Sequence, residues 1–388
     1  MLLNSHGLPS RHGARAGALR VRRSVLIAAL ATAFLGAFAA QAAGESVTVM
    51  TQNLYQGTEF RHFAELQGKT PTQEEAIFAT TRDYGTYVAT RFKDRAQELA
   101  EVISRRHPSL VGLQEVATWH QGAFDPGHPF ALPGPVSEDF TQELLAALEA
   151  DGAHYAVASR HDNNFTLAFP IETSSGLVAV GMVESGVILA RTDLPASRLQ
   201  VSNPQSGTYN ARIPTIENPL VPSEPFEFSN SWQSVDATVR GKTFRFITTH
   251  LDALAPGGVV SGPQAEELLA GPANTTLPVV VSGDMNSGPL TDPAAYNAFV
   301  AGGLSDTWVA AGLGAPPLTC CHLGPFDLSD EKSTVYTQDL DHVFTRGNFS
   351  VLAEHLVGGG PSQFKHVGAF IWPSDHAGMV ARLGLGGL

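Results

Sequence analysis

The sequence predicts an α+β fold in which two mixed β-sheets pack face to face and helices cover their outer surfaces. Segments typical of strands outnumber segments typical of helices, and the helical segments are interspersed along the chain. Several strand-like segments end abruptly at polar residues, as strands do where they leave a buried sheet. Two packed sheets with outer helices fit this order of elements.

The first 42 residues are predicted to be a cleaved export signal. Residues 1–23 contain five arginines and no acidic residue, Val25 to Ala40 is apolar, and Ala40-Gln41-Ala42 is a small-x-small cleavage site. The apolar stretch is short for a membrane span, which favours a cleaved signal over an anchor. Arg22-Arg23 leaves both the general and the twin-arginine route open. We therefore expect a secreted or periplasmic protein.

The exported chain is expected to be a strongly acidic single domain, residues 43–388. The full chain of 388 residues has a formal charge of −13, and loss of five arginines with the signal changes it to −18. Such a surface repels polyanions at long range, although bound divalent cations still attract phosphate locally. The composition therefore argues against an enzyme that binds nucleic acid tightly and moves along it, and small phosphoesters remain possible substrates. No repeat or linker divides the domain.

Period-two and helical spacing place the elements of the first half. A strand at 47–53 precedes an insertion at about 56–88, which is expected to be mostly irregular with one short helix at 72–80. Apolar residues recur at helical spacing from Thr90 to Arg106, and Pro108 follows the end of that helix. The remaining elements of this half are a buried strand at 109–116 that ends near Glu115, a helix at 140–148, and strands at 155–159, 177–183 and 186–190. The last two strands are expected to form a hairpin.

The second half begins with a long loop at about 195–230, rich in Pro, Ser and Asn. Strands at 233–239 and 243–250 form a hairpin around Arg240-Gly241-Lys242. The later elements are a helix at 264–269, a strand leading to Asp284, a helix at 294–301, and strands at 340–345, 349–355 and 377–383.

The most informative strand end follows the apolar run 277–281. Gly283 lets the backbone bend, and Asp284 and Asn286 are two residues apart, so on an extended chain both side chains point the same way. An isolated Asp-x-Asn is also a common turn former. Other strand ends carry polar groups of the same kind, namely Asn53, Glu115, His250, Asp341, Asp375 and His376.

These strand ends, in this order, resemble the endonuclease/exonuclease/phosphatase superfamily of metal-dependent phosphoesterases. The matching segments are 50–54, 111–116, 185–191, 248–251, 283–287, 340–343 and 374–376. They span residues 47 to about 383, and the ordered set is specific for the superfamily while the substrate stays open. The resemblance implies a four-layer αββα sandwich with its site where loops of both sheets meet.

The resemblance also implies a metal site. Glu115 would be the first ligand of Mg²⁺, with Mn²⁺ or Ca²⁺ as alternatives, because hard cations prefer carboxylate and carboxamide oxygens. Asn53 would support the metal or the phosphate, and Asp375 would be a second metal ligand or a water-binding group. The alternatives are a solvent-facing strand end for Glu115 and a turn-forming role for Asn53.

The same resemblance implies the catalytic residues. Asp284 would orient or deprotonate the attacking water, and Asn286 would hold that water or a phosphate oxygen. Asp341 would fix the imidazole of His376 and keep it cationic against phosphate. His250 would donate to the phosphate or the leaving group, the alternative being a core histidine bonded locally.

Other motifs have more than one interpretation. Cys320 and Cys321 are adjacent and could pair with each other, pair between molecules or stay free; a local staple is favoured, and a zinc site is not. The role of His342 is open, and Lys365-His366 is expected to be a solvated pair. Phe370-Ile371-Trp372 is expected to pack locally, or to contact lipid or a base if exposed. The aromatic residues at 226–232 are a second lipid-facing candidate.

The function predicted from the sequence is that of an exported, Mg²⁺-dependent phosphoesterase, a nuclease-like phosphodiesterase that uses in-line attack of water. The expected partner is a phosphoester, whether nucleic acid, phospholipid or a small phosphodiester, bound by a monomer with no stable protein partner. A sphingomyelinase-type phospholipase C is the alternative within the superfamily. A catalytically silent binding module on the same fold is the alternative of another class, and it would predict losses among the site residues.

Overall fold

The computed structural model describes residues 45–386 except 214, 216–217, 219–220, 222–224, 227, 323–325, 327, 331–335 and 365–367. The side chains of 164–167 are also outside this description. The expected export signal and Lys365-His366 lie outside the described residues. Within the described part, no helix combines the length and the apolar character needed to cross a membrane.

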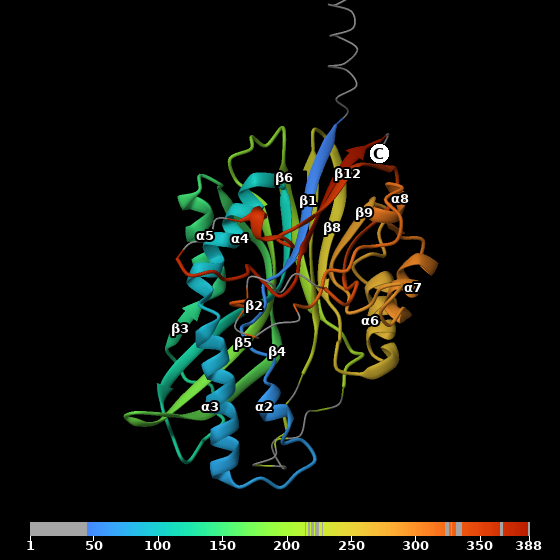
Figure 1. Ribbon diagram of the computed structural model, residues 1–388. Coiled ribbons are helices and arrows are strands. Elements are labelled where there is room, and N and C mark those ends of the chain that lie inside the picture. Colours follow the sequence, from blue (N-terminus) through green and yellow to red (C-terminus); the bar gives the residue numbers. More distant parts are fainter. Residues whose placement is uncertain are drawn as a thin grey trace, which may run out of the picture. The chain divides into compact units, whose positions relative to one another are not determined.

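Two mixed β-sheets form the centre of the fold (Figure 1). The first sheet has the order β12-β13-β1-β2-β5-β4, with β3 paired to β2, and the second has the order β10-β11-β9-β8-β7-β6. The first contains β1 (Ser46–Asn53), β2 (Leu110–Ala123), β3 (Val136–Asp139), β4 (Tyr155–Thr173), β5 (Gly176–Arg191), β12 (Phe349–Val357) and β13 (Gly378–Leu385). The second contains β6 (Gln200–Thr208), β7 (Ser231–Val239), β8 (Lys242–His250), β9 (Val279–Asp284), β10 (Ser305–Asp306) and β11 (Asp341–Arg346). The parallel pairs are β1–β2 and β8–β9, so each sheet is mixed.

Helices cover the outer face of each sheet (Figure 1). The helices are α2 (Arg61–Ala64), α3 (Gln73–Ala89), α4 (Phe92–Arg106), α5 (Phe140–Ala150), α6 (Ser261–Ala270), α7 (Ala294–Ala301) and α8 (Thr307–Ala310), with short 3₁₀ turns at Pro256–Gly258 and Pro361–Gln363. Three buried clusters separate the layers. One joins α4 and α5 to the first sheet, one fills the space between the sheets, and one joins α6 and α7 to the second sheet. The predicted α+β fold with two packed sheets is confirmed.

The segment 56–88 is more helical than expected. Besides the single turn of α2, it contains most of α3, which ends at Ala89, nine residues beyond the predicted helix end at residue 80. Thr72 and Glu75 form a capping box: the Glu75 backbone N–H donates to Thr72 Oγ1 (3.2 Å), and the Thr72 N–H donates to Glu75 Oε2 (2.8 Å). The description as a mostly irregular insertion is therefore wrong, although the Thr-x-x-Glu signal was present in the sequence.

Two strand predictions also require correction. The expected hairpin at 177–190 is a single strand, β5, which pairs with β2 on one side and β4 on the other, so ladder hydrogen bonds continue through Ser185 where a turn was expected. The expected loop at 195–230 contains β6, because this segment pairs along β7 at the edge of the second sheet. Strand pairing depends on distant partners, which local composition does not reveal.

Candidate active site

Asp284 lies at the end of β9, between two other polar strand ends. In the strand register it is directly opposite His250 of the parallel strand β8 and Asp341 of the antiparallel strand β11. The preceding residue has to be glycine, because a β-carbon on Gly283 would overlap the backbone oxygen of Thr249. Sheet register therefore brings together three residues that are far apart in the sequence.

The Asp284 carboxylate is held by two hydrogen bonds. Asn53 Nδ2, from β1 of the other sheet, donates to Oδ2 (3.0 Å), and the Asn286 backbone N–H donates to Oδ1 (2.9 Å). Burial favours the neutral acid, but the charges of His376 and His250 outweigh that effect and lower the pKa of Asp284. Asp284 is therefore an oriented, ionised carboxylate at neutral pH.

Two carboxylate–histidine pairs converge on Asp284 from different strands. Asp341 Oδ2 lies 2.7 Å from His376 Nδ1, and His376 Nε2 lies 3.7 Å from Asp284 Oδ2. Glu184 Oε1 lies 3.2 Å from His250 Nδ1, and His250 Nε2 lies 3.8 Å from the same oxygen of Asp284. Each imidazole is thus oriented by a carboxylate behind it and directs its other nitrogen toward Asp284.

Both imidazoles are cationic at neutral pH. Burial alone would lower the pKa of His250, but the hydrogen bond to Glu184 and the charges of Asp284, Glu184 and Glu115 raise it to about 10. Burial likewise opposes the charge on His376, but Asp341, Asp375 and Asp284 raise its pKa well above the usual value. The site therefore presents two positive donors beside one negative acceptor.

The other side of the site is acidic. Glu115 is not at a strand end as expected: β2 continues past it, and Glu115 lies in a β-bulge with a φ of 54°. A bulge redirects a side chain out of the regular alternation. Its carboxylate accepts hydrogen bonds from Asn53 Nδ2 (2.8 Å) and from the Gln56 backbone N–H (2.9 Å).

Asp375 and Glu59 add two more carboxyl groups beside Glu115. Burial raises the pKa of Asp375 to about 6, with His376 opposing the shift and Glu115 adding to it. Glu59 remains reachable by solvent, but loss of hydration inside the hollow and the charges of Asp375 and Glu115 raise its pKa to about 8. The charge of Glu115 thus acts on both of these carboxyl groups, and His376 opposes both shifts.

This donor set fits a hard divalent cation. Glu115, Asp284 and His376 each offer one ligand atom, and these atoms lie within 4.8 Å of one another. Because His376 is cationic, the carboxylates are the groups suited to a metal, and carboxylate oxygens are what Mg²⁺, Mn²⁺ and Ca²⁺ prefer.

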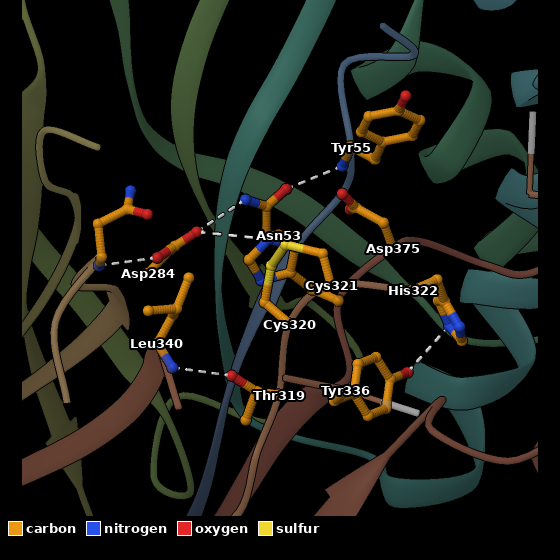
Figure 2. Close-up of a disulfide and its surroundings, with 12 residues drawn as sticks. Asn53, Tyr55, Asp284, Thr319, Cys320, Cys321, His322, Tyr336, Leu340 and Asp375 are labelled. Carbon is orange, nitrogen blue, oxygen red and sulfur yellow. Dashed lines mark hydrogen bonds and ion pairs between the residues drawn. A yellow bond between two sulfur atoms is a disulfide. The ribbon is translucent and has the colours of Figure 1, made fainter. Parts of the chain in front are cut away.

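Two predicted residues have a different environment from the one expected. Asn53 Oδ1 accepts a hydrogen bond from the Tyr55 backbone N–H (2.8 Å), and Nδ2 donates to the carboxylates of Glu115 and Asp284, so Asn53 positions both acids (Figure 2). Asn286 has a φ of 45°, its side chain donates to the Leu251 backbone oxygen (2.8 Å), and β9 ends before it. The extended spacing assumed for Asp284 and Asn286 is therefore wrong, although Asn286 still lines the same hollow.

Residues 85–376 match the family described as Endonuclease/Exonuclease/phosphatase family, a span of more than half of the 388-residue chain. The chain belongs to this family. It is similar in structure to an endonuclease/exonuclease/phosphatase family protein from Leptotrichia buccalis C-1013-b, with 15% identity and a TM-score of 0.52 over 87% of this chain and 100% of that chain. That similarity shows the shared fold.

Two further solved structures are similar over most of their length. D. rerio TDP2, complexed with a single strand DNA product, has 15% identity and a TM-score of 0.47, covering 88% of this chain and 99% of that one. The human Nocturnin catalytic domain with bound sulfate has 18% identity and a TM-score of 0.46, covering 87% and 93%. A search of curated proteins gives no match.

Within this family fold, sequence reasoning missed three residues that shape the site. Glu184 orients His250, and it directly precedes the segment 185–191 that carried the resemblance. Glu59 was hidden in the segment interpreted as an insertion. Arg95 is fully buried and donates to the backbone oxygens of Thr90, Leu54, Pro373 and Tyr55, so it ties the loop after β1 to the loop before Asp375. Arg95 is three residues after Phe92 and four before Leu99, so the helical spacing of α4 already places it on the buried face.

The two cysteines form a disulfide in the wall of the site. Cys320 and Cys321 are bonded to each other, which agrees with the favoured local staple, and both line the same hollow as Asp284 and His376. Figure 2 shows the disulfide with Asp284 on one side of it and Asp375 on the other. The preceding residue, Thr319, accepts hydrogen bonds at Oγ1 from the backbone N–H groups of Leu340 (3.1 Å) and Asp341 (3.0 Å).

The remaining ambiguous residues lie away from the chemistry. His342 is buried, with Nδ1 2.9 Å from Asp306 Oδ2 and Nε2 3.1 Å from the Asp339 backbone oxygen. Ile371 and Trp372 are 1% and 0% exposed, and Phe370 is partly buried against the same core cluster, which confirms that this segment packs locally.

Proposed function

We propose that the chain is an exported, Mg²⁺-dependent phosphodiesterase that hydrolyses its substrate by in-line attack of water. One observation carries the proposal: two imidazoles, each held by its own carboxylate, converge on the ionised Asp284 at the edge of an acidic hollow. Phosphoryl transfer needs an oriented nucleophile, donors for the phosphoryl oxygens and a proton for the leaving group, and these residues supply all three.

Glu115 and Asp375 are the residues that would hold the cation, with Mg²⁺ as the expected ion and Mn²⁺ or Ca²⁺ as alternatives. Asn53 and Gln56 fix Glu115, and burial, with the charge of Glu115 adding to it, raises the pKa of Asp375 to about 6. When bound, the cation supplies charge neutralisation at the phosphoryl oxygens and lowers the pKa of a bound water.

The chain's own residues then divide the proton transfers. Asp284 accepts a hydrogen bond, and finally the proton, from the attacking water, whose oxygen binds phosphorus as the ester P–O bond breaks. His376, kept cationic by Asp341, donates to a phosphoryl oxygen. His250, kept cationic by Glu184, is on the other side of Asp284 and donates a proton to the leaving alkoxide.

A silent binding module would have lost part of this constellation. Six of the predicted residues line one hollow, namely Glu115, His250, Asp284, Asn286, Asp375 and His376. Asn53 and Asp341 are bonded directly to members of that set. Retention of the complete set supports an enzyme.

The test is hydrolysis of bis-p-nitrophenyl phosphate, p-nitrophenyl phosphate, sphingomyelin and plasmid DNA by the full chain, each with Mg²⁺ and with EDTA. We expect turnover that requires the cation, with the diester hydrolysed faster than the monoester. Equal rates with EDTA, or no turnover of any phosphoester by the folded protein, would contradict the proposal.

A further inference from the structure

The hollow that contains the catalytic residues also has an apolar wall. Its volume is about 340 Å³, and it is lined both by catalytic residues such as Asp284 and His376 and by aromatic and aliphatic side chains. The apolar lining consists chiefly of Phe60, Phe63, Phe228, Leu251, Leu254 and the Cys320–Cys321 disulfide. We call these residues the apolar wall. The volume of the whole hollow is at the lower end of the range for small-molecule sites, roughly 300–1,000 Å³.

The apolar wall is firmly supported by the fold. Phe60 and Phe63 flank the start of α2 and are 7% and 6% exposed. The ring of Phe63 packs edge-on against Phe226 at 5.7 Å between centroids. Leu251 directly follows His250, so the wall begins one residue from a catalytic donor. In contrast, Leu254 is 55% exposed and extends the apolar surface toward solvent.

The charge in the hollow is unsuited to a polyanion. Five carboxyl groups line it, from Glu59, Glu115, Glu184, Asp284 and Asp375, and no lysine or arginine of the described part of the chain does. Arg61 lies in an adjoining hollow that shares Glu59 and Asp375, but its side chain is beside Phe326 and 3.6 Å from Glu65. One cation-bridged phosphate fits these acids, whereas flanking phosphates of a nucleic-acid strand would be repelled.

We propose that this site selects phosphodiesters in which an apolar alkyl or aryl group is attached next to the scissile phosphate, and that this group binds against the apolar wall. The inference rests on the proposed phosphodiesterase activity and names its substrate class. Both parts of the hollow define the ligand. The carboxylates, through a bound cation, and the imidazoles would bind a single phosphate, and the apolar wall would bind a hydrocarbon group.

The inference has a measurable size. Burial of one methylene is worth roughly 0.8 kcal/mol, which corresponds to about a fourfold change in kcat/KM per methylene. Between a methyl and a butyl ester, three methylenes are added, so the ratio is expected to reach some tens of fold. Beyond the length that the wall covers, further methylenes should add nothing.

The experiment compares methyl, butyl and octyl p-nitrophenyl phosphodiesters with the full chain and Mg²⁺. The leaving group is the same throughout, so differences report the spectator group. We expect kcat/KM to rise by some tens of fold from methyl to butyl and then to level off. Leu254→Asn should reduce the butyl-to-methyl ratio. Val259→Asn is the matched control, because Val259 is also exposed (67%) and close in sequence but does not line the hollow, so the ratio should be unchanged.

Binding of methyl and butyl phosphonate, measured by calorimetry, separates the two proposals because phosphonates are not hydrolysed. Tighter binding of the butyl compound without any diester turnover would support the wall and refute the proposed activity. Turnover with a butyl-to-methyl ratio near one would refute the wall and leave the activity intact. A single-stranded oligonucleotide cleaved with a higher kcat/KM than the butyl diester would also overturn the inference.

Discussion

Replacement of Asp341 by Asn isolates the contribution of one carboxylate–histidine pair. The Asp341 and His376 side chains are 0% and 5% exposed, and their 2.7 Å contact is what orients the imidazole and keeps it charged. Removal of one member of a buried pair costs about 3–5 kcal/mol, because the remaining charge has no partner. If that cost falls on the cationic form of His376 that the transition state requires, kcat/KM falls by roughly 10²–10⁴.

The assay is cation-dependent hydrolysis of bis-p-nitrophenyl phosphate by Asp341→Asn, with thermal unfolding as a check on folding. The chain offers a matched control in Asp306→Asn, because Asp306 forms an equally buried pair with His342 (2.9 Å) outside the hollow. That control should lose stability but keep its kcat/KM. The reasoning fails if Asp341→Asn retains activity within about tenfold, or if the two variants lose activity equally while folded.

Three further predictions follow from the site. The pKa values of Glu59 and Asp375 are raised to about 8 and about 6, so protons on these groups compete with a bound cation. Mg²⁺ affinity measured by calorimetry should therefore increase from pH 5 to pH 9, and a flat or falling profile would contradict this. Glu184→Gln removes the partner that raises the pKa of His250 to about 10, so the alkaline limb of the pH–rate profile should move to lower pH, and an unmoved limb would exclude this role. Arg95→Leu leaves four backbone oxygens without their buried donor, and each unsatisfied group costs roughly 1–3 kcal/mol, so the free energy of unfolding should fall by several kcal/mol. A loss below about 1 kcal/mol in urea unfolding would show that these hydrogen bonds contribute little to stability.

The sequence predicted the site better than it predicted the elements around it. Asp284 and His250 each end an apolar strand, whereas Asp341 begins its strand, and the register places the three residues side by side. The strand pattern predicted that polar groups gather at the strand ends, and the family resemblance supplied their grouping into one site. Glu184 lies inside a continuous strand, where nothing local marks it. Arg95 was missed although its spacing from Phe92 and Leu99 places it on the buried face of α4.

Pairing across the sheets was the other source of error. The continuous strand β5 was divided into a hairpin because Glu184-Ser185-Gly186 interrupts its apolar pattern. Of its polar residues, Glu184 lines the hollow and the Ser185 hydroxyl donates to Asp162 Oδ1 (2.8 Å). Similarly, Glu115 was placed at a strand end, whereas a bulge lets β2 continue beyond it. In both cases the functional residue breaks the regular pattern on which the prediction depended.

The most direct test of the account is the Asp284→Asn variant, because both imidazoles and both sheets converge on that carboxylate. Hydrolysis of bis-p-nitrophenyl phosphate with Mg²⁺ is measured for this variant and the unchanged chain, with circular dichroism to establish that both are folded. The account predicts a loss of about 10²-fold or more in kcat. A folded variant that keeps more than about a tenth of the activity would show that Asp284 does not handle the attacking water.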